Sequence, residues 1–173
     1  MTVRKAQIDE LDGLMMFFTR MNEVINVRNN DYDPDNEVYP PYDTVLSAIE
    51  NGELTVGTED GVLCAACIVN HDCPEEYLGV KWQVEAAEDE FSVLHALRVA
   101  PEYEGRGFAR QMISHVVSAA AESGQKAMRL DVLEGYSVEQ MYLRMGFKYV
   151  DTVELYYADI GYPKRFRLLE MVL

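Results

Sequence analysis

A loop with two glycines joins an apolar strand to an amphipathic helix, and this arrangement constrains the fold more than any other feature. Residues Phe91–Val99 are typical of a strand, and the loop that follows contains Gly105-Arg106-Gly107. Apolar residues then recur at helical spacing up to Gly124, a residue that commonly follows a helix. The recurring positions are Ala109, Met112, Ile113, Val116, Val117 and Ala120. A second strand is expected at Ala127–Leu133, so the segment predicts a strand, a helix and another strand in succession.

The rest of the chain predicts alternating strands and helices. Asp9 is a candidate cap for the first helix, Asp60-Gly61 is typical of a hairpin turn, and Ser137 with Gln140 forms a capping-box pattern. Residues 71–90 are polar and predict an excursion between two strands. In chain order, strands are expected at 1–5, 53–58, 62–70, 91–99, 127–133, 147–157 and 165–173, and helices at 10–26, 44–50, 109–123 and 137–145.

The resulting order is βααβββαβαββ, which predicts an α/β (α+β) fold: a mostly antiparallel mixed sheet flanked by helices. The 173 residues, 49% of them hydrophobic, favour a single domain spanning 1–173. No apolar run approaches the roughly 18 residues of a membrane span, and the N-terminus does not resemble a secretion signal. We therefore expect a cytoplasmic protein without a membrane partner.

The negative charge is concentrated in the first part of the chain. Residues 1–97 contain 20 acidic and 5 basic residues, a net charge of −15, whereas residues 98–148 contain 6 acidic and 7 basic residues, a net charge of +1. Nucleic acid is not an expected partner, because binding it requires a basic face. A cationic ligand suits the first part, and an anionic ligand suits only the second.

Three cysteines do not form a disulfide framework, but a metal site has to be considered. Cys64 and Cys67 form a CxxC pattern, with His71 and Cys73 close behind. Residues 61–70 are typical of a buried strand, in which side chains three positions apart point to opposite faces. We expect core cysteines and no metal.

The glycine loop is a candidate phosphate site. Gly105 and Gly107 allow the backbone to approach a ligand closely, and the next helix begins with unpaired amides and the positive end of its dipole. The loop lacks both the dinucleotide-binding and the P-loop patterns. A tight turn without a ligand is the simpler interpretation of these glycines.

Two segments, LHALRVAPEYEGRGFARQMI and LRMGFKYV with Tyr142 just before it, resemble the signature motifs of the GNAT acetyltransferases. The resemblance implies a splayed sheet in which pantetheine lies between the fourth and fifth strands. It implies an N-acetyltransferase that moves an acetyl group from acetyl-CoA, its co-substrate, to a primary amine of a small molecule or peptide. A GNAT-like module that binds acyl-CoA with little turnover is the alternative.

By the same resemblance, the cofactor-binding residues are Leu97, Arg98, Val99, Glu104, Gly105, Arg106, Gly107, Phe108, Ala109, Ser137 and Tyr142. Two positions depart from the family pattern. Glu104 stands where Arg or Gln is usual, and is expected to turn to solvent or to pair with Arg106 or Arg110. Gly135 stands where Asn is frequent, and Ser137 is a possible replacement contact.

Acetyl transfer requires a neutral amine, a stabilised oxyanion and a proton for the leaving thiolate. The resemblance assigns Tyr142 as the acid and an amide near Leu97 as the oxyanion donor. His95, on the same strand as Leu97 and Val99 and with the same parity, is the candidate base, and Glu90 is its competitor.

The acceptor is expected on the side formed mainly by residues 9–90, with the cofactor side at 91–149. A loop there alternates acidic and aromatic residues that suit a cation, although a solvated acidic loop is the simpler interpretation. Its members are Asp31, Tyr32, Asp33, Asp35, Glu37, Tyr39, Tyr42 and Asp43. A homodimer is left open.

Overall fold

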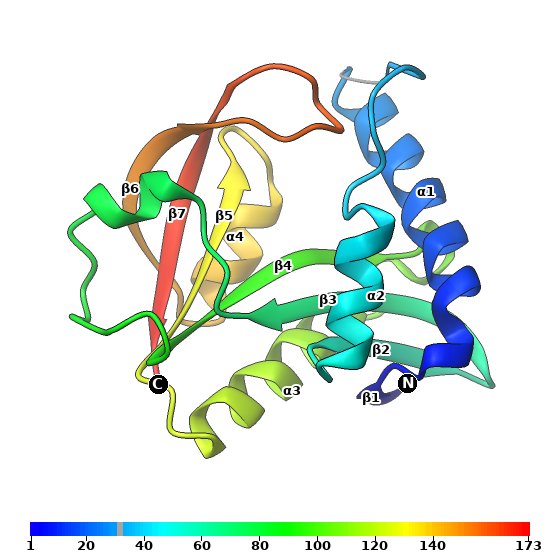
Figure 1. Ribbon diagram of the computed structural model, residues 1–173, viewed down its shortest axis with the longest axis horizontal. Helices are drawn as coiled ribbons and strands as arrows, with labels where there is room; N and C mark the ends of the chain where they lie inside the picture. The colour runs from blue at the N-terminus through cyan, green and yellow to red at the C-terminus, as the bar shows by residue number, and fades with distance from the viewer. Residues whose placement is uncertain (31–32) are drawn as a thin grey trace. The chain divides into compact units, whose positions relative to one another are not determined.

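The computed structural model describes residues 1–30 and 33–173 (Figure 1). The strands are β1 (Thr2–Lys5), β2 (Leu54–Glu59), β3 (Val62–Asn70), β4 (Phe91–Val99), β5 (Ala127–Leu133), β6 (Lys148–Leu155) and β7 (Lys164–Val172). The α-helices are α1 (Leu11–Arg28), α2 (Tyr42–Glu50), α3 (Phe108–Glu122) and α4 (Val138–Arg144). Short 3-10 turns occur at η1 (Ile8–Glu10), η2 (Glu75–Gly79) and η3 (Pro101–Tyr103). The predicted order βααβββαβαββ is confirmed.

The strands form one seven-stranded sheet in the order β1-β2-β3-β4-β5-β7-β6. β1 and β2, β2 and β3, β5 and β7, and β6 and β7 pair antiparallel, whereas β4 and β5 pair in parallel. The predicted mostly antiparallel sheet with flanking helices is therefore confirmed. Among residues 1–30 and 33–173, no helix is both long enough and apolar enough to cross a membrane.

Contacts divide the chain into two compact units, each assembled from three stretches. Unit 1 contains Met1–Ile68, Ala96–Met112 and Tyr156–Tyr162, and unit 2 contains Val69–His95, Ile113–Leu155 and Pro163–Leu173. β3, β4 and α3 each contribute residues to both units.

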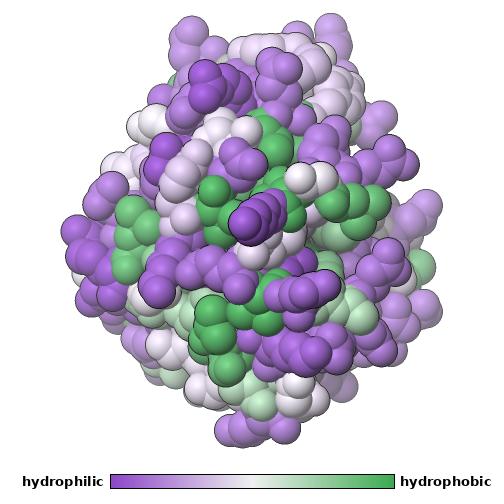
Figure 2. All heavy atoms as spheres, turned by 90° about the vertical axis from the view of Figure 1, so that its left-hand side faces the viewer, coloured by the Kyte–Doolittle hydropathy of each residue, from purple (hydrophilic) through white to green (hydrophobic). Residues whose placement is uncertain are grey.

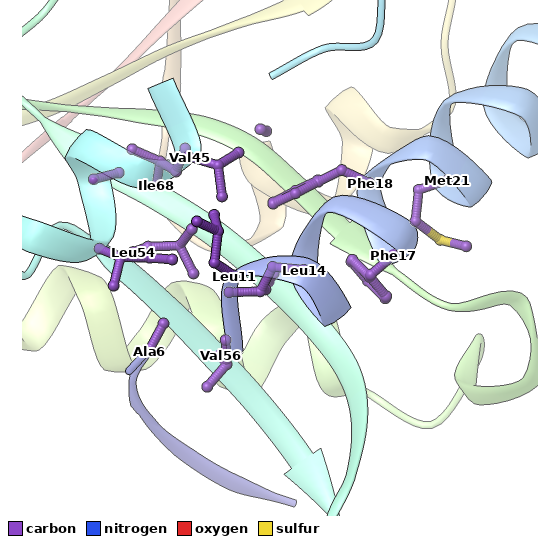
Figure 3. Packing of buried hydrophobic residues seen from close by; sticks show 14 of the residues in the cluster. Ala6, Leu11, Leu14, Phe17, Phe18, Met21, Val45, Leu54, Val56 and Ile68 are labelled. Carbon is purple, nitrogen blue, oxygen red and sulfur yellow. The ribbon is translucent and has the colours of Figure 1, made fainter. Parts of the chain in front are cut away.

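Unit 1 has a core in which α1 and α2 pack against strands β2 and β3. Leu14 and Phe18 of α1 belong to one buried cluster with Val45 of α2 and with Leu54 and Ile68 of the strands (Figure 3). All five side chains are at most 1% exposed. The helical spacing of the apolar residues in α1 is thus explained by a single buried face.

Unit 2 holds the polar excursion of residues 71–90 through a buried ion pair. Arg129 on β5 donates from Nε to Glu170 on β7 over 3.0 Å, and its guanidinium lies 4.3 Å from the ring centre of Trp82. The other carboxylate oxygen of Glu170 accepts the amides of Gln83 and Val84. Specific hydrogen bonds to Glu170 therefore attach the polar segment 71–90 to the sheet.

The surface carries scattered apolar side chains, as Figure 2 shows for one face, where small hydrophobic groups are separated by hydrophilic ones. In unit 2 the exposed large hydrophobic residues include Leu78, Tyr149 and Val172. Scattered apolar side chains are usual on protein surfaces and do not by themselves indicate an interface. The predicted possibility of a homodimer stays a prediction.

Two predicted helix caps differ from the structure. Asp9 lies within the turn η1, and Glu10 occupies the position before α1, so Asp9 is not the cap. Ser137 does precede α4, but its own backbone is helical and its side chain makes no capping hydrogen bond to the described residues. The capping-box pattern therefore locates this helix correctly without the bonds that the pattern usually supplies.

Candidate active site

The glycine loop leads directly into α3. Gly105 and Gly107 have φ angles of +73° and +79°, which side-chain-bearing residues rarely adopt. A Cβ built at either glycine would meet no described atom within 4 Å, so the space in front of the loop is open. Gln111 donates the first helical hydrogen bond to the carbonyl of Gly107 over 3.1 Å. By helix geometry the amides of Phe108 and Ala109 precede this first donor, so they have no carbonyl of the helix to bond and are available to a ligand.

Arg106, between the two glycines, is held by a carboxylate and by two aromatic rings. Nη1 and Nη2 lie 2.7 and 2.8 Å from the two carboxylate oxygens of Glu59. The guanidinium carbon lies 5.4 Å from the ring centre of Tyr103 and 4.9 Å from that of Phe108. A two-point ion pair and two aromatic rings therefore restrain the guanidinium of Arg106.

Glu104 pairs with a residue that sequence reasoning did not consider. Its carboxylate accepts Nη1 of Arg28, at the end of α1, over 2.5 Å. The carboxylate thus pairs with neither Arg106 nor Arg110, the two predicted partners, whereas its exposure agrees with the third alternative, that it turns to solvent. The same helix reaches the loop a second time, because Arg20 pairs with Glu102. Both contacts lie within unit 1.

Leu97, Arg98 and Val99 follow a break in the extended backbone of β4. Ala96 has a φ of +49°, in the left-handed region, although it is buried in a strand. Regular alternation of side chains is interrupted at such a residue, so strand parity does not support the predicted link between His95 and Leu97 or Val99. Within the described residues, the buried Nε of Arg98 has no hydrogen-bond partner, while Nη1 donates to the Leu97 carbonyl over 3.2 Å.

His95 belongs to unit 2 and is partly buried. Its Nε2 lies 3.0 Å from the carbonyl oxygen of Asp72. Since a carbonyl can only accept, Nε2 carries the proton in this contact, and in the neutral ring Nδ1 keeps its lone pair. Burial lowers the pKa of His95, and the charges of Asp131 and Asp72 oppose this effect without cancelling it. The lowered pKa favours the neutral ring, which is the form that can act as a base.

Asp131, whose charge acts on the pKa of His95, was not predicted from the sequence as a residue of the site. It lies on β5 within unit 2, and the hydroxyl of Tyr77 donates to its carboxylate over 2.8 Å. Tyr77 comes from the excursion and is 2% exposed. The signal available in the sequence was a lone acidic residue in the apolar strand AMRLDVL.

Tyr142 and Ser137 lie on α4 and at its start, within unit 2. The Tyr142 ring is 6% exposed and meets Phe147 edge to face, with ring centres 5.6 Å apart. Ser137 is exposed. Gly135 has a φ of +92°, so the residue that replaces the usual Asn occupies a left-handed turn that glycine adopts readily.

Glu90, the competing base, is already paired. Its carboxylate accepts Lys126 Nζ over 2.6 Å and the amide of Ala87 over 3.0 Å. The hydrogen bond from Lys126 lowers the pKa of Glu90, which makes this carboxylate a weaker base than an ordinary glutamate.

The CxxC cysteines are core residues. Cys64 and Cys67 are both fully buried and unbridged, as expected, and burial raises the pKa of Cys67 to about 12. In the part of the chain that the structure describes, no group of three or more His, Cys, Asp or Glu side chains is placed to hold a metal ion. His71 instead bonds through Nδ1 to the carbonyl of Phe91 over 2.6 Å.

The acidic loop is only partly described, because Asp31 and Tyr32 lie outside the described residues. Asp33 and Asp35 are exposed, and the carboxylate of Asp33 accepts the amide of Asp35 over 2.9 Å. Tyr39 meets the ring of Tyr157 edge to face at 5.0 Å. Residues 156–162 therefore pack beside this loop within unit 1, which the sequence did not predict.

The predicted site residues thus fall into two sets. Unit 1 contains Leu97, Arg98, Val99, Glu104, Gly105, Arg106, Gly107, Phe108 and Ala109, and unit 2 contains His95, Ser137 and Tyr142. The first set includes a loop with open space before it, and the second contains an imidazole whose pKa is lowered by burial and a buried phenol.

Comparison with known proteins identifies a matching family and solved structures with a similar fold. The model of the acetyltransferase (GNAT) family matches residues 21–147, more than half of the chain. No curated protein matches the sequence.

Solved structures share the fold at low sequence identity. A GNAT-family acetyltransferase from Streptococcus agalactiae has a TM-score of 0.80 at 19% identity, covering 99% of this chain and 95% of that one. An acetyltransferase from Salmonella typhimurium, solved with its cofactor acetyl-CoA, has a TM-score of 0.70 at 15% identity, covering 100% and 94%. A polyamine N-acetyltransferase from Drosophila melanogaster, which forms N-acetylagmatine, has a TM-score of 0.68 at 18% identity, covering 99% of each chain.

Proposed function

Because the chain belongs to the GNAT acetyltransferase family, we propose that it is an N-acetyltransferase that moves an acetyl group from acetyl-CoA to a primary, cationic amine. The observation that carries this proposal is the open glycine loop at the start of α3. Gly105 and Gly107 hold a left-handed backbone with free space before it, followed by helix amides that have no intrahelical acceptor. These features fit a diphosphate group, which needs close backbone approach and N–H donors.

Acetyl-CoA would supply the thioester carbonyl on which the chemistry takes place. The backbone of Leu97 and Val99 would hold the pantetheine arm, and an amide near Leu97 would stabilise the developing oxyanion. The left-handed backbone at Ala96 supports this role, because a distorted strand presents amides that are directed away from a regular ladder.

Two side chains would manage the protons. Tyr142 would donate a proton to the departing thiolate. His95 would accept the proton of the attacking ammonium through Nδ1, directly or through water, because Nε2 donates to the Asp72 carbonyl. Glu90 is the poorer candidate, since Lys126 already holds its carboxylate.

A cationic acceptor is supported by the uneven charge. Residues 1–97 contribute a net charge of −15, and residues 98–148 contribute +1. The exposed carboxylates of Asp33 and Asp35 would attract a cation near the aromatic rings of Tyr39 and Tyr157. The polyamine N-acetyltransferase with a similar fold acts on an acceptor of this chemical class.

A second candidate function is an acyl-CoA-binding module with little turnover. The observation in its favour is the carboxylate of Glu104 in the loop, together with the burial of the Tyr142 ring at 6% exposure. Such a module would bind acetyl-CoA and release no thiol when amines are added.

The first experiment is a calorimetric titration of the full chain with acetyl-CoA. We expect saturable binding at one site per chain. Absence of binding at millimolar acetyl-CoA would contradict both candidate functions and leave the glycine loop as a structural turn.

A further inference from the structure

We propose that Arg28, on α1 and outside the predicted cofactor motif, binds the phosphate groups of acetyl-CoA, because the loop's own cation, Arg106, is held by Glu59. The inference rests on the proposed function, because it concerns the ligand proposed there. It gives the end of α1 a role in cofactor binding that no motif of the sequence indicates.

The charges around the glycine loop are balanced in pairs. Glu59, Glu102 and Glu104 face Arg106, Arg20 and Arg28, respectively, within unit 1. An anionic ligand that approached this balanced set would gain little attraction. A guanidinium of these three pairs that turned from its carboxylate toward the ligand would shift the balance in favour of an anion.

Arg106 is poorly suited to turn. Both of its terminal nitrogens bond Glu59, and its guanidinium lies against the rings of Tyr103 and Phe108. Its release would break a two-point ion pair and two aromatic contacts together.

Arg28 is much better placed to turn. Within the described residues it contacts Glu104 through Nη1 alone, which leaves most of its N–H donors available. The two side chains are 51% and 48% exposed, and such exposed ion pairs are weakly held. Glu104 immediately precedes Gly105, so the pair holds the guanidinium next to the first residue of the glycine loop. Phosphate, with its greater charge and bidentate geometry, is a stronger partner for Arg28 than a single carboxylate oxygen.

The test compares acetyl-CoA affinity in four full-length proteins by calorimetry: the parent, Arg28→Gln, Glu104→Gln and the double variant. If Arg28 binds phosphate, Glu104→Gln strengthens binding because it frees the guanidinium, and Arg28→Gln weakens it. The decisive comparison is between Glu104→Gln and the double variant, which both lack the Glu104 carboxylate and differ only at Arg28. The double variant should bind about tenfold more weakly than Glu104→Gln.

Two controls separate contact from general charge effects. Arg4→Gln removes an exposed cation of unit 1 that is paired with Glu10, and should leave acetyl-CoA affinity within about twofold of the parent. S-acetyl pantetheine carries the thioester without any phosphate, and its affinity should be the same for Glu104→Gln and the double variant. Thermal unfolding of each variant confirms that the fold is retained.

Equal acetyl-CoA affinities for Glu104→Gln and the double variant would overturn the inference, because Arg28 would then only neutralise Glu104. The same effect with S-acetyl pantetheine would also overturn it. A parent chain that failed to bind acetyl-CoA would instead contradict the proposed function, and the inference with it.

Discussion

Arg129 and Glu170 form a buried ion pair in which Nε lies 3.0 Å from the carboxylate and the side chains are 4% and 0% exposed. The pair joins β5 to β7, and through the amides of Gln83 and Val84 it also holds the excursion between β3 and β4. A buried pair of this kind contributes most visibly when one partner is removed, because the remaining charge has no compensation.

We expect Arg129→Met to lower the free energy of unfolding by about 3–5 kcal/mol, since it leaves the Glu170 carboxylate buried without its cation. Urea denaturation measures the change. The matched control is Arg4→Gln, which removes one partner of the exposed Arg4–Glu10 pair and should cost about 1 kcal/mol or less. Equal costs for the two variants would show that the buried pair does not hold the excursion.

Gly107→Val should abolish acetyl-CoA binding while the protein remains folded. A branched side chain disfavours the φ of +79° and would fill the open space proposed for the diphosphate. Calorimetry measures the binding. Gly52→Val is the matched control, because Gly52 also has a positive φ of +68° with open space but lies outside the proposed site. Parent-like binding by Gly107→Val would remove the loop from the cofactor site.

Tyr142→Phe should slow turnover by about 10²-fold, the lower end of what a positioned acid contributes. Acetyl-CoA affinity should stay within a few-fold of the parent, because packing against Phe147 is nearly conserved. Steady-state kinetics with a competent amine measure the change, and Tyr149→Phe, an exposed tyrosine of β6, is the control. If kcat is unchanged, solvent rather than Tyr142 protonates the thiolate.

His95 should impose an acid limb on the pH profile of kcat/KM. Burial lowers the pKa of His95 from its ordinary value of 6.5. The neutral base therefore predominates at pH 7 and is lost only as the pH falls below 6.5. Protonation of His95 is also less favourable in the folded than in the unfolded chain, so the free energy of unfolding should decrease as the pH falls below 6.5.

His95→Gln should remove this limb and lower kcat/KM on the neutral side. His115→Gln, on the exposed face of α3, is the control and should leave the profile unchanged. An acid limb that persisted in His95→Gln would assign it to another group.

The acidic loop should govern substrate affinity rather than the chemical step. Replacing Asp31, Asp33 and Asp35 together by Asn should raise KM for a cationic amine and leave kcat nearly unchanged, because steering and ground-state binding are lost. The salt dependence of kcat/KM should weaken in this variant, since screening acts over about 8 Å at physiological ionic strength. The charge-matched control replaces Asp60, Glu122 and Glu154, all exposed, by their amides. Equal effects of the two triple variants would show that the acidic loop does not bind the substrate and that its charge serves solubility.

The order of elements could be predicted from the sequence because it depends on local signals. Apolar spacing located the helices, and residues such as Gly52, Asp60 and Gly124 located their ends and the hairpin turn. The loop proposed to bind the cofactor was also located by a local signal, two glycines between a strand and a helix.

Contacts between distant parts of the chain could not be predicted. Arg28 and Glu104 are 76 positions apart, and Tyr77 and Asp131 are 54 positions apart, so no spacing rule connects them. The left-handed backbone at Ala96 was equally hidden, because alanine carries no turn signal and the surrounding strand is apolar. Tertiary contacts thus decide the charge environment of a loop whose position is set locally.

The most direct test of the central claim is amine-dependent release of CoA thiol from acetyl-CoA by the full chain. A panel should include a polyamine, an amino sugar, a basic peptide and a neutral amine, with mass spectrometry of the product. The account predicts thiol release only when an amine is present, acetyl on the amine nitrogen, and the highest kcat/KM for a cationic acceptor. Saturable acetyl-CoA binding without thiol release for any member of the panel would contradict the claim and favour the acyl-CoA-binding module.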